Sequence, residues 1–172
     1  ARLDAMVRII GIDPGLRSAG WGIIAQVGSK LSYVADGAVH SDADKPLAER
    51  LLQIHVQLMD IIRAHEPDEA AIEETFVNTD ARATLKLGQA RGVIMLAPAM
   101  LQIPVAEYAP NTVKKTVVGA GHAEKDQVKH MVRLLLPRAQ MKTADSTDAL
   151  AIAICHAHHR GSQTLAKLLA RS

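Results

Sequence analysis

The sequence predicts an α/β protein built on a mixed, five-stranded sheet with helices on both faces. Three apolar, β-branched runs joined by short turns occupy the first 40 residues, and strands connected so closely must pair antiparallel. Two later short strands are each preceded by a long helical pattern, which is typical of parallel crossover connections. Three more helices complete the chain, so the predicted order is β-β-β-α-β-α-β-α-α-α.

The first three strands form the antiparallel part of the predicted sheet. They are expected at residues 7–12, 21–27 and 31–39. Pro14-Gly15 is a turn dipeptide after the first strand, and Gly28-Ser29-Lys30 predicts a hairpin between the other two. Residues 1–6 precede the first strand and are expected to be an extension of the domain.

The later elements are predicted from helical periodicity and from the positions of proline and glycine. Pro46 opens a helix whose apolar residues recur at helical spacing and which ends before Pro67. Short strands are expected at residues 69–74 and 103–108. Helices are expected at residues 79–101, 110–118, 124–136 and 145–159. Residues 1–172 are predicted to form one domain, with a polar, frayed tail from about residue 161.

Composition and charge narrow the class of protein. The net charge of +2 is unevenly divided, because residues 1–110 carry −4 and residues 111–172 carry +6. This asymmetry indicates an anionic partner for the C-terminal third. No apolar run approaches the roughly 20 residues of a membrane helix and no signal-peptide pattern is present, so a cytoplasmic protein without membrane contact is expected. Cys155 lies in an apolar run and is interpreted as a buried structural residue.

Acidic residues occur at the ends of apolar elements. Asp13 ends the first core strand, where an ionised group is costly unless it is paired or bound to a metal. Glu73 and Glu74 end the fourth predicted strand. Asp145 and Asp148 lie three apart at the start of the last helix and so share one face. The ordinary alternatives are a turn cap, an exposed strand edge and a helix cap, respectively.

The combination of these acids favours a metal site. Carboxyl ends of parallel strands meet at one edge of a sheet, where the active sites of α/β proteins gather. Several carboxylates at that edge cannot all stay ionised without a cation. Oxygen ligands suit Mg²⁺ or Mn²⁺, and a pair of such ions is the clamp used to attack a phosphodiester. The glycines after Asp13 lead into a strand, which argues against a phosphate-binding loop.

Five segments, spread from Arg8 to about His158, form a recognisable series: GIDPGLRSAGWG, IEETF, ATLKLGQARGV, VKKTVVGAGHAEKDQVKHMVRLLL and DSTDALAIAICH. In sequence and in order they resemble the RuvC family of bacterial Holliday-junction resolvases, the crossover junction endodeoxyribonucleases. The resemblance implies a ribonuclease-H-like fold, a homodimer and Mg²⁺-dependent nicking of two like-polarity strands in a four-way DNA junction. It also implies a role in recombination and repair with the branch-migration proteins RuvA and RuvB.

The resemblance assigns roles to individual residues. The family's four catalytic acids, which bind two Mg²⁺ ions that Mn²⁺ can replace, match Asp13, Glu73, Asp145 and Asp148. The resemblance therefore selects Glu73 over Glu74, whereas strand alternation leaves both open. The active-site lysines of the family match Lys114 and Lys125, and Lys115 remains an alternative to Lys114. The acid that binds each ion is left open.

Other residues are candidates for contacts with DNA or with a second subunit. The aromatic residue that inserts at the junction in the family matches Phe76, for which a core position is the alternative. Basic side chains that can track backbone phosphates are Arg82, Lys86, Arg91, Lys115, Lys129, Arg133, Arg138 and Lys142. Gly88 and Gly92 predict close helix packing, within the fold or across a dimer axis. Histidines 156, 158 and 159 are interpreted as the polar flank of the last helix.

Two other functions were weighed against a nuclease. An ATPase of the actin and sugar-kinase type also carries an acid and glycines after its first strand, but it needs a second lobe that 172 residues do not provide. A junction-binding protein without activity would be expected to lack one of the acids, and all four are present.

Overall fold

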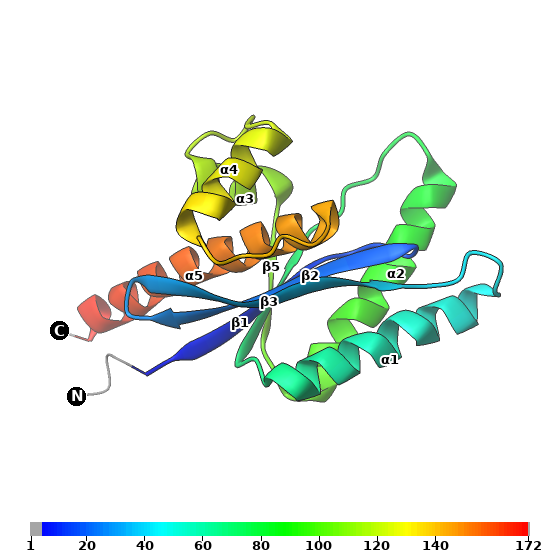
Figure 1. Cartoon of the computed structure of the whole chain (residues 1–172), viewed down its shortest axis with the longest axis horizontal. Coiled ribbons are helices and arrows are strands. Elements are labelled where there is room, and N and C mark those ends of the chain that lie inside the picture. Colours follow the sequence, from blue (N-terminus) through cyan, green and yellow to red (C-terminus); the bar gives the residue numbers. More distant parts are fainter. Residues whose placement is uncertain (1–4, 172) are drawn as a thin grey trace.

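The computed structural model describes residues 5–171, apart from the side chains of residues 163–168 in the last helix. Its elements, in chain order, are β1 (Val7–Asp13), β2 (Ser18–Val27), β3 (Lys30–His40), α1 (Leu47–His65), β4 (Glu69–Glu73), α2 (Ala81–Met100), β5 (Val105–Tyr108), α3 (Pro110–Val118), α4 (Lys125–Leu135) and α5 (Ala144–Ala170). This order confirms the predicted succession of strands and helices (Figure 1).

The five strands form one sheet in the order β3-β2-β1-β4-β5. β1 pairs antiparallel with β2 and β2 with β3, whereas β4 is parallel to β1 and β5 is parallel to β4. The mixed sheet and the central place of the first strand are therefore confirmed. No helix among the described residues is long and apolar enough to cross a bilayer.

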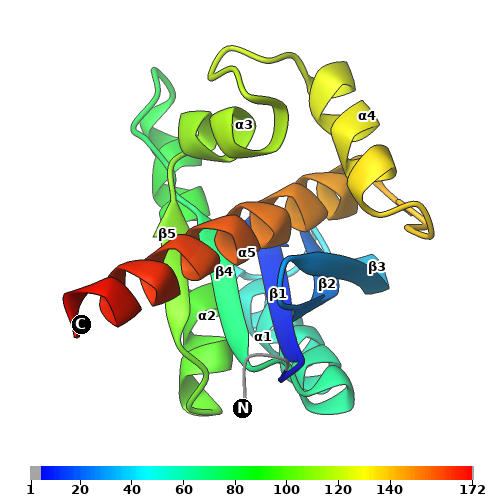
Figure 2. The ribbon, with the colours of Figure 1, turned by 90° about the vertical axis from the view of Figure 1, so that its left-hand side faces the viewer.

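Helices cover both faces of the sheet, as predicted (Figures 1 and 2). α1 and α2 pack on one face, while α5 crosses the other beneath α3 and α4. β1 is enclosed on both faces, because Ile9 belongs to the core under α5 and Ile10 to the core under α1. A strand buried on both faces reads as a continuous apolar run rather than an alternating one.

The two ends of the chain are predicted to be an extension and a frayed tail. Most of the expected extension falls on residues 1–4, which lie outside the described residues. The last helix does not end near residue 159 but continues to Ala170. The added stretch contains one glycine and otherwise mainly good helix formers, so its polar character does not interrupt the helix.

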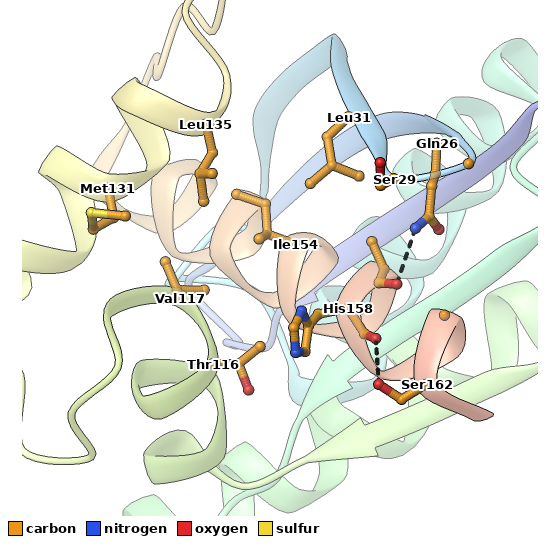
Figure 3. Close-up of a pocket in the computed structure, with 13 residues that line it drawn as sticks. Gln26, Ser29, Leu31, Thr116, Val117, Met131, Leu135, Ile154, His158 and Ser162 are labelled. Carbon is orange, nitrogen blue, oxygen red and sulfur yellow. Dashed lines mark hydrogen bonds between the residues drawn. The ribbon is translucent and has the colours of Figure 1, made fainter. Parts of the chain in front are cut away.

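A hollow of about 580 Å³ opens between the β2–β3 hairpin and helices α3, α4 and α5 (Figure 3). Its walls are mostly apolar and include Leu31, Val117 and Ile154. The Gln26 side-chain amide donates a hydrogen bond of 3.1 Å to the Ala157 carbonyl at its edge. None of the described residues lining it carries a carboxylate, so this hollow is not the predicted metal site.

Candidate active site

Two parallel strands deliver the first two acids to one edge of the sheet. β1 and β4 pair in register up to Ile12 and Ile72, so the next residues, Asp13 and Glu73, both stand at the carboxyl ends of their strands. None of the described residues donates a hydrogen bond to the Asp13 carboxylate, which argues against the turn-cap alternative. The predicted convergence at this edge is confirmed.

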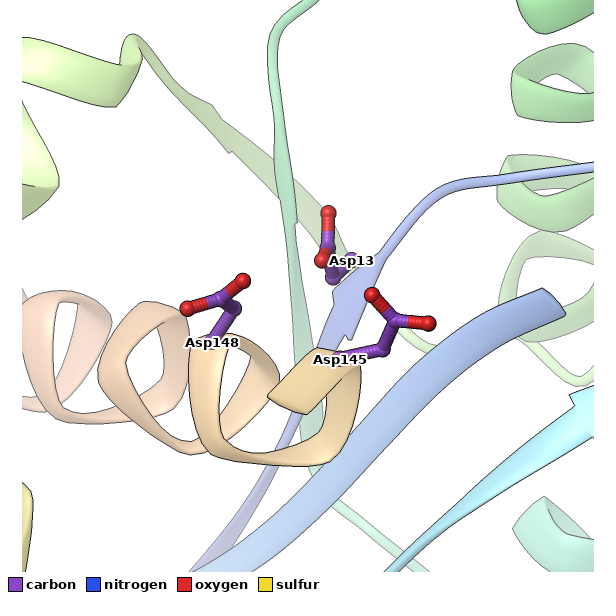
Figure 4. A group of neighbouring side chains, drawn as sticks. All are labelled: Asp13, Asp145 and Asp148. Atoms are coloured by element: carbon purple, nitrogen blue, oxygen red, sulfur yellow. The ribbon is translucent and has the colours of Figure 1, made fainter. Parts of the chain in front are cut away.

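Helix α5 brings the other two acids over the same edge. Asp145 and Asp148 project from its first turns toward Asp13 (Figure 4). The helix-cap alternative for Asp145 is wrong, because Thr143 caps the helix through a hydrogen bond of 2.9 Å from the Ser146 amide to the Thr143 hydroxyl. Both aspartates are thus free to face the cleft.

Glycines in β1 and β2 allow α5 to lie this close to the sheet. A Cβ atom on Gly20 would lie 2.1 Å from the Asp145 carbonyl oxygen, and one on Gly11 would lie 2.1 Å from the Ala149 carbonyl oxygen. These distances are far below van der Waals contact, so any side chain at either position would displace the helix. The sequence argues against a phosphate loop here but does not predict that these glycines make room for a helix, because Asp145 of that helix lies 125 residues away from Gly20.

The acids form a compact cluster inside a cavity of about 300 Å³. Carboxylate oxygens of Asp13, Asp145 and Asp148 lie within 4.8 Å of one another. Glu73 stands outside that trio but lines the same cavity. Lys114 and Lys125 line it as well, and they are its two cationic side chains among the described residues.

Crowding and burial perturb the acids strongly. Burial, followed by the charges of Asp148, Glu73 and Asp145, raises the pKa of Asp13 to about 8. Burial also raises the pKa of Glu73, with a further contribution from Asp148. The pKa of Asp148 is raised chiefly by burial, although Lys125 opposes the shift. A cluster that resists ionisation to this extent is a site where a cation would bind favourably.

The chemistry of the donors indicates which cation fits. The cluster offers carboxylate oxygens only, and the three aspartates are half-buried rather than enclosed, so room remains for water and substrate. Hard divalent ions such as Mg²⁺ and Mn²⁺ prefer this donor set, whereas zinc sites are usually built from cysteine and histidine. The residues present therefore fit Mg²⁺ or Mn²⁺.

The structure separates the two adjacent lysines that sequence analysis left open. Lys114 is half-buried and lines the acidic cavity, while Lys115 is exposed and does not line it. Lys125, at the first position of α4, also borders an adjoining cleft together with Lys129 and Lys142. Positive charge thus continues outward from the acids along α4.

Most of the predicted DNA-contact residues are exposed, but one of them is held in an ion pair. Phe76 is 64% exposed in the segment between β4 and α2, so the core alternative is wrong. The exposed basic candidates are Arg82, Lys86, Lys115, Lys129, Arg133, Arg138 and Lys142. Arg91 does not fit the expectation, because its guanidinium contacts Glu107 and donates a hydrogen bond of 3.1 Å to the Glu73 carbonyl oxygen.

Three further expectations are settled by packing. Cys155 is buried, as predicted. His156 is not part of a polar flank, because it is buried with Nε2 2.7 Å from Glu69 Oε1 and Nδ1 2.7 Å from the Tyr108 hydroxyl. A Cβ on Gly88 or Gly92 would meet nothing within 4 Å, so the prediction that these glycines pack closely inside the fold is wrong.

Comparison with known proteins agrees with the geometry of the site. The profile of the RuvC family, described as crossover junction endodeoxyribonuclease RuvC, matches residues 9–156. The chain is 60% identical over 164 residues to a crossover junction endodeoxyribonuclease RuvC of Rhizobium etli, covering 95% of this chain and 97% of that protein. It is 64% identical over 156 residues to the RuvC of Rhodopseudomonas palustris strain TIE-1, covering 91% and 90%.

A solved structure of T. thermophilus RuvC in complex with a Holliday junction substrate superposes with a TM-score of 0.85. The two chains are 32% identical, and the match covers 92% of this chain and 97% of that one. The yeast mitochondrial Holliday junction resolvase Ydc2 shares the fold, with a TM-score of 0.63 at 13% identity over 91% of this chain and 82% of that chain. The ribonuclease-H-like fold, the acidic edge and these matches together show that the chain belongs to the RuvC family of crossover junction endodeoxyribonucleases.

Proposed function

We propose that this protein is a Mg²⁺-dependent endonuclease that resolves four-way DNA junctions by paired nicks in strands of like polarity. The observation that carries the proposal is the meeting of Asp13, Asp145 and Asp148 within 4.8 Å in a cavity that also holds Glu73 and two lysines. By resemblance, the activity belongs to recombination and repair in the cytoplasm, alongside RuvA and RuvB.

The four acids would hold two divalent ions, and all four line the same cavity. When bound, such ions activate a water molecule toward phosphorus and stabilise the departing 3′ oxygen. The acids themselves orient the ions, because strand ends and a docked helix hold them. Lys114 and Lys125 lie where they can offset the charge that develops on the phosphate.

Two symmetric nicks require two such clusters, and one chain carries one among its described residues. We propose a homodimer formed through α2. Its outer stripe, at helical spacing, consists of Leu85, Gly88, Gly92, Leu96 and Met100. The three large side chains are 50–64% exposed, and both glycines face open space, so a second helix can approach closely.

The activity is tested with a synthetic four-way junction and Mg²⁺, comparing the wild-type protein with Asp13→Asn. We expect nicks at symmetric positions from the wild type and none from the variant, although the variant should still bind the junction. Junction binding without nicks by the wild-type protein would contradict the proposed activity. Nicks by Asp13→Asn at the wild-type rate would contradict the proposed site.

The dimer is tested with Leu85→Asp, which should shift the protein from dimer to monomer in light scattering. Leu52→Asp is the matched control, because Leu52 is 61% exposed on α1 and Leu85 is 64% exposed. We expect the monomer to lose simultaneous nicking of both strands. A Leu85→Asp protein that stays dimeric would place the interface elsewhere.

A further inference from the structure

One buried carboxylate is not used by the proposed chemistry. Asp36, in β3, is 0% exposed and is the one carboxylate of the described residues that is fully enclosed. Its Oδ2 accepts hydrogen bonds from the Ser146 hydroxyl at 2.6 Å and from the Lys142 amide at 2.8 Å. Its Oδ1 accepts a hydrogen bond from the Tyr33 hydroxyl. Neutral groups therefore satisfy this acid, without a cation in direct contact.

Two of these bonds tie Asp36 to the start of α5, because Ser146 lies in its first turn and Lys142 in the loop just before it. Ser146 follows Asp145 directly, and successive residues of a helix point about 100° apart. The Ser146 side chain is buried on the sheet side while Asp145 and Asp148 face the cleft. Thr143 and Ser146 also form a capping box, because the backbone amide of each donates a hydrogen bond to the hydroxyl of the other. Asp36 binds the Ser146 hydroxyl and so connects this capping box to β3.

A carboxylate suits this position for a physical reason. Burial would raise the pKa of Asp36, but hydrogen bonds from Ser146, Tyr33 and the Lys142 amide outweigh it and lower the pKa. An ionised carboxylate can accept all three hydrogen bonds, whereas an asparagine amide would point its NH₂ group at one or more of these donors. The three donors come from the edge strand, the loop before α5 and α5 itself.

We infer that Asp36 is a positioning residue, which fixes the rotation and placement of the first turn of α5 so that Asp145 and Asp148 meet Asp13. The inference rests on the proposed metal site and extends it to a residue outside the cavity. It predicts that loss of the Asp36 bonds weakens metal binding by the folded protein, in addition to any loss of stability. A carboxylate with a stabilising role alone would lower the stability and leave the metal affinity of the folded protein unchanged.

The test compares Asp36→Asn and the milder Ser146→Ala with Glu69→Gln. Glu69 is the matched control, because it is also a hydrogen-bonded carboxylate that holds α5 to the sheet, through His156 and Arg160, but far from the acids. Calorimetric titration with Mn²⁺ alone gives the affinity, and urea unfolding without metal gives the stability. Nicking is then followed as a function of Mg²⁺ concentration.

We expect both Asp36→Asn and Ser146→Ala to weaken Mn²⁺ binding by about tenfold or more, as is typical when support for metal ligands is removed. The Mg²⁺ concentration for half-maximal nicking should rise to match, and excess Mg²⁺ should restore much of the rate. Glu69→Gln should lower stability and leave Mn²⁺ affinity unchanged. Ser146→Ala keeps the test decisive if Asp36→Asn does not fold.

Unchanged Mn²⁺ affinity in folded Asp36→Asn or Ser146→Ala protein would overturn the inference. Equal losses of affinity in these variants and in Glu69→Gln would overturn it too, since any loosening of α5 would then have the same effect. Failure of the proposed function gives a different result: the wild-type protein would not bind Mn²⁺, and Asp13→Asn would match it. That outcome removes the metal site and the role of Asp36 with it.

Discussion

Helix α5 contacts acidic residues at its start and again at its middle, and the surroundings of these acids differ between the two places. At its start, Asp13, Asp145 and Asp148 crowd together, and burial and repulsion raise the pKa of Asp13 to about 8. At its middle, Glu69 lies 2.7 Å from both the His156 ring and the Arg160 guanidinium. Burial opposes ionisation of Glu69, but these hydrogen bonds outweigh it and lower its pKa.

The difference separates a structural acid from a functional one. Both groups lie between the same helix and the same sheet, so burial alone does not distinguish them. At Glu69 the chain supplies its own hydrogen-bonding partners, one of which is the Arg160 guanidinium. At the acid cluster, which we define as Asp13, Asp145 and Asp148, Lys114 and Lys125 compensate only in part. A proton or a cation from solution has to supply the rest, which is why we propose a metal site here and not at Glu69.

The largest expected effect comes from exchanging an acid for its amide at each of the two places on α5. Asp148→Asn should lower the nicking rate on the order of a thousandfold, because a metal ligand is lost. The free energy of unfolding without metal should stay the same or increase, since a repelling charge is removed. Glu69→Gln should instead lose about 1–3 kcal/mol of stability and keep its nicking rate. Single-turnover nicking and urea unfolding measure the two quantities.

Similar changes in nicking rate and stability in the two variants would contradict the distinction between a functional acid and a structural one. A loss of stability in metal-free Asp148→Asn would mean that the acid cluster stabilises the fold. Normal nicking by that variant would mean that Asp148 is not a ligand.

The second expected effect tests how closely α5 must approach the sheet. Gly20→Ala would place a Cβ 2.1 Å from the Asp145 carbonyl, so the first turn of α5 has to move. We expect a stability loss of about 1–3 kcal/mol from overpacking and roughly a hundredfold slower nicking from misplaced ligands. Gly161→Ala, beyond the middle of the helix where a Cβ meets nothing within 4 Å, is the control. It should leave nicking unchanged and raise stability by up to about 1 kcal/mol, because alanine is the better helix former. Normal nicking by Gly20→Ala would show that the acid cluster tolerates displacement.

Gly20 also shows which features of the fold could not be predicted from the sequence. The order and pairing of the strands follow from local signals, because short turns force antiparallel pairs and long helical connections permit parallel ones. Asp13 and Glu73 could be placed at one edge on the same grounds. The role of Gly20 could not, because it depends on where a distant helix crosses the strand.

Buried polar partners were missed for a similar reason. Asp36 lies in a strand of mixed polarity and has the sequence context of a surface acid, yet it is fully enclosed. His156 has the context of a polar flank, and Arg91 that of a phosphate contact. Each is instead satisfied by a residue from another element, Glu69 and Glu107 in the last two cases. Pairings of this kind exist only once the elements are packed.

A smaller effect is expected from Phe76, which is 64% exposed in the segment after β4 at the acidic end. If it stacks on unpaired bases at the junction, Phe76→Ala should weaken junction binding or cleavage by about 1–3 kcal/mol, which is fivefold or more. Stability should be unchanged. Val77→Ala is the control, since Val77 is even more exposed at 86% but offers no aromatic face. Cleavage by Phe76→Ala at the wild-type rate would exclude the stacking role.

The last expected effect is a pH dependence that differs between the two places on α5. Folded Asp13 has a pKa of about 8, whereas its ordinary value is 3.8, so between these values the folded state holds more protons. Metal-free protein should therefore lose about 3 kcal/mol of stability as the pH rises from 6 to 9, which is roughly 5–10 °C in Tm. Glu69 has a lowered pKa, so its stabilisation is present at neutral pH and is lost only in acid, as the pH falls below the ordinary value of 4.5.

At neutral and alkaline pH, metal should reverse this trend and mutation of Asp13 should remove it. Mg²⁺ binds the ionised carboxylates, so its stabilising effect should grow as the pH rises and protons leave the acid cluster. Asp13→Asn removes the titrating group with the highest pKa and should flatten the metal-free profile. Glu69→Gln should leave the slope between pH 6 and 9 unchanged while lowering the whole curve. A metal-free Tm that stays level over this range in the wild-type protein would mean that Asp13 is already ionised at pH 6, and that the lysines compensate it.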